Sequence, residues 1–155
     1  MTGQAIRKLA GAAAAICVVL VPAVVRGHVS IWPRQSAAGA TEKYTVRVPT
    51  EGKVMTVGAD MEAPEGVAIE TVAMPAGWTY ELKRTGDRVT GISWNMSIKP
   101  GEFAEFSFVA RNPRDKEQLV WTLRQRFADG TVQDFTKGPN GIRPTAITRL
   151  TPMAK

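Results

Sequence analysis

The sequence predicts an all-β protein: an antiparallel β-sandwich of immunoglobulin or fibronectin type that follows a cleaved signal peptide. Two observations predict the sandwich. Apolar and polar residues alternate in many short runs, and turn sequences rich in Gly and Pro separate these runs at regular spacing. After residue 27, no stretch of twelve residues has helical periodicity. About seven to nine short strands at this spacing favour a sandwich over a barrel, although the Cys…Trp…Cys pattern of antibody domains is missing.

The first 27 residues have the pattern of a secretory signal peptide. The basic pair Arg7-Lys8 precedes an apolar run over residues 9–25. A retained membrane anchor is the alternative, but 17 residues that include Gly, Pro and many Ala lie at the short limit for a membrane span. We therefore expect removal of residues 1–27, a single domain over residues 28–155, and a periplasmic or secreted product with no membrane anchor.

Two cleavage sites fit the rule that a signal peptide ends in small residues. Cleavage after Ala23 and cleavage after Gly27 both satisfy it, and the pattern leaves the choice open. Only cleavage after Gly27 makes His28 the first residue of the mature chain. Cys17 lies inside the apolar run and follows Ile16, so we expect it to leave with the signal rather than carry a lipid.

Two predicted strands in the first half of the domain have strict alternation. Within residues 41–49, the apolar residues Tyr44, Val46 and Val48 alternate with polar ones, and over residues 78–83 every second residue is apolar. The shorter apolar runs 54–57 and 67–72 predict two strands between them. A tight turn is predicted after the run 54–57, where Pro64-Glu65-Gly66 supplies the backbone angles that it needs. Pro75-Ala76-Gly77 supplies them in the same way after the run 67–72.

The second half of the domain contains four more predicted strands. Apolar residues mark the runs 89–94, 105–108 and 146–150. The longest run is Gln118–Phe127, in which Leu119, Trp121, Leu123 and Phe127 share one face and Thr122, Arg124 and Arg126 share the other. Trp78, Trp94 and Trp121 lie in these patterns, so we predict that they are core residues. Trp32 lies outside these strand patterns, because it comes before Pro33 at the start of the domain.

Composition excludes several classes of function. One His and one Cys cannot form a paired Cys and His zinc site, a three-histidine zinc site, a two-histidine copper brace or an internal disulfide framework. The formal net charge is +6, and it falls to +3 when the signal peptide and its three basic residues are removed. Because Lys and Arg are scattered over the chain, we expect no nucleic-acid partner.

An N-terminal histidine would be a chelating residue. The α-amine and the imidazole Nδ1 of His28 could bind one ion in a six-membered ring, so that one residue supplies two nitrogen ligands. The other interpretation is that His28 is an exposed residue beside a processing site. The residue pattern alone leaves both interpretations open.

Four stretches of the chain together resemble one protein family. They are His28–Pro33, Thr45–Glu51, Pro75–Glu81 and Ile98–Phe108, and they read HVSIWP, TVRVPTE, PAGWTYE and IKPGEFAEFSF. In this order they are similar to the YcnI-like family of bacterial exported copper-associated proteins. The resemblance covers essentially the whole mature chain.

The resemblance implies a β-sandwich that binds one Cu(II) through an N-terminal histidine, with a glutamate and a tryptophan beside the metal. His28 matches the histidine and Glu51, at the end of TVRVPTE, matches the carboxylate. Phe135 stands where the family has tryptophan, so the ring beside the metal is either Phe135 or Trp32. Amine, imidazole and carboxylate ligands suit Cu(II), whereas a Cu(I) site built from Cys or Met is not expected.

The sequence therefore predicts a Cu(II)-binding protein for copper homeostasis or copper delivery, and not an enzyme. The implied partners are the copper ion and either another periplasmic copper chaperone or a membrane copper transporter. The alternative is a structural or adhesive immunoglobulin-like β-sandwich without a metal site. A copper oxidase or monooxygenase is disfavoured because the second histidine is missing.

Overall fold

The computed structural model describes residues 28–136 and 146–152. These residues contain twelve strands. The strands are β1 (Ser30–Trp32), β2 (Gln35–Ala37), β3 (Thr41–Pro49), β4 (Thr56–Glu62), β5 (Ala68–Val72), β6 (Thr79–Thr85), β7 (Arg88–Ile98), β8 (Phe103–Arg111), β9 (Gln118–Val120), β10 (Thr122–Phe127), β11 (Val132–Asp134) and β12 (Ile147–Thr151). The signal segment and Cys17 lie outside the described residues.

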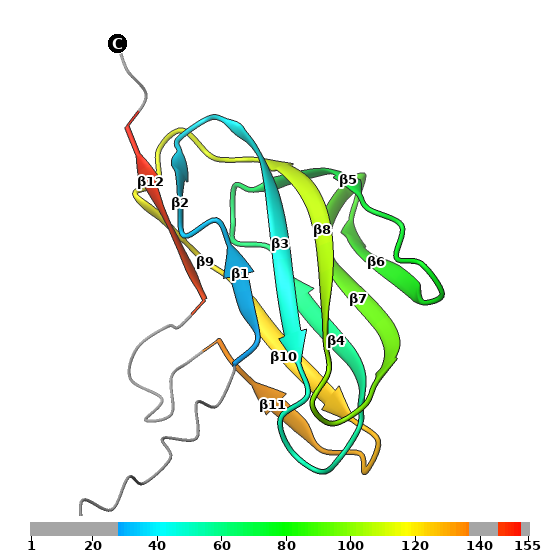
Figure 1. Ribbon diagram of the computed structural model, residues 1–155. Coiled ribbons are helices and arrows are strands. Elements are labelled where there is room, and N and C mark those ends of the chain that lie inside the picture. The colour runs from blue at the N-terminus through cyan, green and yellow to red at the C-terminus, as the bar shows by residue number, and fades with distance from the viewer. Residues whose placement is uncertain (1–27, 137–145, 153–155) are drawn as a thin grey trace, which may run out of the picture.

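The strands form two facing sheets and a small third sheet (Figure 1). One large sheet has the order β1-β3-β8-β5 and the other has the order β11-β10-β4-β7-β6. Within both, every pair of neighbours is antiparallel. The third sheet, β2-β12-β9, closes one side and contains the parallel pair β2 and β12. The predicted all-β, immunoglobulin-like sandwich is thus confirmed.

The strand count exceeds the prediction for two reasons. Four strands, β1, β2, β9 and β11, have only three residues each, which is too short for alternation to be visible in the sequence. The single long strand predicted over Gln118–Phe127 is two strands, because the chain changes sheets at Trp121. β9 pairs with β12 in the small sheet, whereas β10 pairs with β4 and β11 in a large one.

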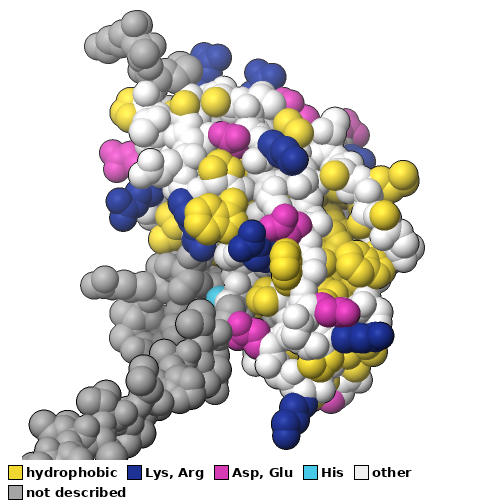
Figure 2. Space-filling view, in the orientation of Figure 1, with side chains coloured by type: hydrophobic (Ala, Val, Ile, Leu, Met, Phe, Trp, Pro, Cys, Tyr) yellow, Lys and Arg dark blue, Asp and Glu magenta, His cyan; other side chains and the backbone are white. Residues whose placement is uncertain are grey.

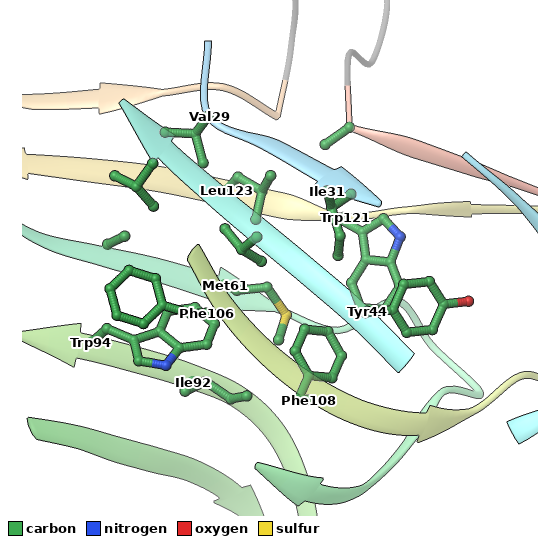
Figure 3. Close-up of a cluster of buried hydrophobic side chains, with 14 of the residues drawn as sticks. Val29, Ile31, Tyr44, Met61, Ile92, Trp94, Phe106, Phe108, Trp121 and Leu123 are labelled. Carbon is green, nitrogen blue, oxygen red and sulfur yellow. The ribbon is translucent and has the colours of Figure 1, made fainter. Parts of the chain in front are cut away.

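The aromatic core lies between the two large sheets, as Figure 3 shows. Trp94 and Trp121 have no exposed surface, which agrees with their predicted core positions. The Trp121 ring lies 4.8 Å from that of Tyr44 and 5.7 Å from that of Phe108, between ring centroids. Burial raises the pKa of Tyr44 to about 12, and its hydroxyl donates a hydrogen bond to Asn112.

Trp78 packs against the core but is less buried than Trp94 and Trp121. It lies just before β6 and is half-buried, with its ring 5.7 Å from that of Phe106. Trp32, by contrast, is 47% exposed, which agrees with its position outside the strand patterns of the sequence. Among the described residues, no helix has the length and apolar character needed to cross a membrane.

Candidate metal site

His28, Glu51 and Phe135 come from three chain segments that meet at one end of the sandwich. β1 runs antiparallel to β3, with Ser30 opposite Arg47. Continuing this register brings the residues before β1 toward Pro49, the last residue of β3. Glu51 follows β3 by two residues, so the backbone places it at the same end as His28. Antiparallel pairing therefore joins positions far apart in the sequence.

The ring of His28 lies against the ring of Phe135. Their centroids are 5.6 Å apart and their planes make an angle of 72°, an edge-to-face arrangement. His28 is exposed, and part of its side chain (cyan) is visible at the surface in Figure 2. The next residue, Val29, is 3% exposed and points into the core beside Leu123 (Figure 3). The buried Val29 thus anchors the chain immediately after an accessible histidine.

Hydrogen bonds to β10 hold Phe135 and the residue after it. Its N–H donates to the Leu123 carbonyl at 2.8 Å, and the Leu123 N–H donates to the Thr136 hydroxyl at 3.3 Å. Asp134 accepts a hydrogen bond from the Thr136 N–H at 2.8 Å. Hydrogen bonding from Thr136 lowers the pKa of Asp134 below its usual value. Phe135 therefore extends the pairing of β11 with β10 and presents its ring at a fixed place.

The segment that carries Glu51 is fixed by its neighbour Thr50. The Thr50 N–H donates to the Glu102 carbonyl at 2.9 Å, and the Thr50 carbonyl accepts from the Gly101 N–H at 2.8 Å. Thr50 is 1% exposed, whereas Glu51 is exposed. Glu51 is thus an exposed residue on a backbone that is tied to the turn before β8.

Trp32 lies at the other end of β1 from His28. Four residues of extended chain separate their Cα atoms by roughly 13 Å. The Arg34 guanidinium lies over the Trp32 ring, 5.0 Å from its centroid. Of the two rings considered for the place beside the histidine, Phe135 is the one in contact with His28.

The described side chains do not form a complete metal site by themselves. Within residues 28–136 and 146–152, no group of three His, Cys, Asp or Glu side chains could hold an ion. A ligand that is not a side chain could complete a site at His28. The α-amine that cleavage after Gly27 would create is such a ligand, which fits the donor set of amine, imidazole and carboxylate that suits Cu(II).

Gln125 is a residue at this end of the sandwich that the sequence analysis did not single out. It is 2% exposed, and its side-chain amide donates to the Pro49 carbonyl, two residues before Glu51. A signal for it was present in the sequence. Gln125 lies an even number of positions from Leu119, Trp121 and Leu123. It is therefore a polar residue on the apolar face of the Gln118–Phe127 pattern.

Comparisons with known proteins give one family, one similar protein and one solved structure of similar fold. The model of the family described as a domain of unknown function, DUF1775, matches residues 28–146. The copper-binding protein CutI of Bacillus subtilis (strain 168) is 30% identical in an alignment 149 residues long, which covers 88% of this chain and 73% of CutI. An uncharacterized Nocardia farcinica protein with an immunoglobulin-like fold superimposes with a TM-score of 0.67 at 24% identity, over 79% of this chain and 97% of that one.

Proposed function

Because the chain belongs to the DUF1775 family, the YcnI-like family that its motifs resemble, we propose that it is an exported Cu(II)-binding protein. Its relationship to a copper-binding protein indicates a copper-related role. The observation that carries the assignment is the contact of the His28 and Phe135 rings at the end of the sandwich where Glu51 follows β3. The proposed ligands are the α-amine and imidazole of His28 and the carboxylate of Glu51.

The proposed processing step is cleavage after Gly27, which frees the amine of His28. The family match begins at His28, which supports this choice over cleavage after Ala23. The product would be periplasmic or secreted. There it would hold Cu(II) and exchange it with another copper chaperone or a membrane copper transporter, and a single histidine favours such binding over oxidase or monooxygenase chemistry.

The proposed function is tested by copper titration of the protein that begins at His28. We expect one Cu(II) per chain by mass spectrometry under native conditions, and a Cu(II) EPR spectrum with nitrogen hyperfine structure. Binding should weaken on acidification, because protons compete with copper for the amine and imidazole nitrogens. A protein that takes up no Cu(II) would instead support the structural or adhesive alternative.

The substitution Glu51→Gln tests the carboxylate ligand. It keeps the shape of the side chain but removes the negative charge that offsets Cu(II). Because Glu51 is exposed, we expect weaker Cu(II) binding and altered EPR parameters, while the melting temperature of the metal-free protein stays nearly unchanged. A large loss of stability without copper would show a structural role, and an unaltered spectrum would show that the third ligand lies elsewhere.

The substitution Phe135→Trp tests which ring lies beside the copper. An indole in contact with His28 should be quenched by Cu(II), so copper-dependent loss of tryptophan fluorescence should increase relative to the parent. Trp32→Phe is the control, and we expect it to leave most of the parental quenching in place. If Trp32→Phe abolished that quenching, Trp32 would be the neighbouring ring. If neither substitution changed quenching, both rings would be remote from the ion.

A further inference from the structure

A buried polar cluster lies between the two large sheets at the end that carries His28, Glu51 and Phe135. It consists of Gln125 on β10, Thr56 on β4, and Thr50 and the Pro49 carbonyl at the end of β3. Gln125, Thr56 and Thr50 are 2%, 0% and 1% exposed. Elsewhere the space between these sheets is filled largely by apolar and aromatic side chains, so this cluster needs its own explanation.

The hydrogen bonds of the cluster converge on the backbone just before Glu51. Gln125 Nε2 donates to the Pro49 carbonyl at 2.7 Å and to the Thr56 hydroxyl at 2.6 Å. The Thr50 hydroxyl donates to the Thr56 hydroxyl at 2.6 Å. The side chain of Gln125 thus bridges the two sheets, and the residues that it fixes are the two immediately before Glu51.

A local irregularity of β4 turns Thr56 toward this cluster. Ala59 and Met61 point into the core, so regular alternation would place Thr56 on the opposite face. The pairing of β4 with β7 shifts register between Thr56 and Gly58, and Thr56 is buried. Bulges that re-aim a side chain recur beside functional sites.

Gln125 also connects to the Phe135 side of the site through its backbone. It pairs with Gln133 in the short β10–β11 ladder, and Phe135 follows β11 by one residue. One residue therefore links the strand that presents Phe135 to the segment that presents Glu51. Partners behind a metal ligand set its orientation, and their loss costs about 10- to 100-fold in metal affinity.

We propose that Gln125 is a positioning residue of the copper site, which holds Pro49 and Thr50 so that the Glu51 carboxylate stays within reach of an ion at His28. This inference rests on the proposed function and deepens it. Gln125 itself is not a ligand. Its effect on copper passes through Glu51, which distinguishes positioning from a general contribution to stability.

The test compares Gln125→Met with a matched control at the other end of the β3–β8 pair. Asn112 is 3% exposed, and its amide donates to the Ala37 carbonyl and the Ser36 hydroxyl, both at 2.9 Å. It thus makes the same kinds of bonds as Gln125, far from Glu51. Both Gln125→Met and Asn112→Leu should lower the melting temperature. Only Gln125→Met should weaken Cu(II) binding, by about tenfold or more, and change the EPR parameters.

A measurement on the metal-free protein gives an independent readout. In Gln125→Met, amide hydrogen exchange at Thr50 and Gly101 should be faster than in the parent and in Asn112→Leu, because the segment before Glu51 loses its bond to β10. Thr56→Val, which removes both hydrogen bonds accepted by the Thr56 hydroxyl, should reproduce these effects. Thr56→Ser should retain parental behaviour. The Thr56 variants provide the same test if Gln125→Met does not fold.

A double variant decides whether Gln125 acts through Glu51. In a Glu51→Gln background, Gln125→Met should cause little further loss of Cu(II) affinity, and additive losses would overturn the positioning role. Parental copper affinity and spectrum in Gln125→Met would overturn it too, while His28-dependent binding and the proposed function still stood. A parent that binds no Cu(II) through His28 would overturn both.

Discussion

A protein with one additional methionine before His28 is expected to bind Cu(II) far more weakly than the protein that begins at His28. The extra residue converts the α-amine into an amide, which removes one of the two nitrogen ligands and opens the chelate ring. Because a ligand is lost rather than a residue behind it, the loss of affinity should exceed the roughly 10- to 100-fold that outer partners contribute. The measurement is a competition titration of both proteins against a chelator of known Cu(II) affinity.

The two proteins in this comparison should otherwise be alike. His28 is exposed and precedes the first strand, so the extension should leave the melting temperature of the metal-free protein unchanged. Extension by Ala instead of Met is a matched control for the Met thioether. The two extended proteins should bind Cu(II) equally weakly. Equal Cu(II) affinities of the extended and unextended proteins would remove the N-terminal chelate from consideration.

The substitution Trp121→Ala is expected to cause the largest loss of stability, about 3–5 kcal/mol in the free energy of unfolding. Trp121 has no exposed surface and lies where the chain passes from the small sheet to a large one. Its ring packs on Tyr44 and Phe108, and its indole N–H donates to the Thr148 hydroxyl at 3.2 Å. The substitution leaves a cavity and removes the bond that the Thr148 hydroxyl accepts, although this hydroxyl still donates to the Pro33 carbonyl at 2.9 Å. Urea unfolding followed by circular dichroism measures the loss.

Trp32→Ala is the control for this prediction. Trp32 is 47% exposed and its ring carries Arg34 rather than core residues, so we expect a change of less than about 1 kcal/mol. A Trp121→Ala protein as stable as the parent would show that the junction of the sheets can repack around the missing ring. Similar losses in both variants would contradict the assignment of Trp32 to the surface.

Residues with regular alternation could be assigned from the sequence. Tyr44, Val46 and Val48 face the core because side chains in a strand alternate between its two faces, and burial follows this period. Trp94 and Trp121 were predicted in the same way. The assignment of a face fails where alternation is broken, as at Thr56, which a register shift turns inward. At Trp121 the predicted burial is correct but the strand boundary is not, because one apparent strand becomes two. Hydrophobic periodicity shows which residues of a strand share a face, but it does not show which sheet the strand joins.

For the candidate site, the sequence by itself identified the residues proposed as ligands, and only the tertiary structure decided what surrounds them. In a chain with a single histidine, an N-terminal amine is one of the few sources of a second nitrogen ligand, and the family resemblance implies Glu51 as the carboxylate. The contact between His28 and Phe135, and the bond from Gln125 to Pro49, each join residues more than seventy positions apart. Such contacts depend on strand pairing between distant segments, which local sequence does not encode.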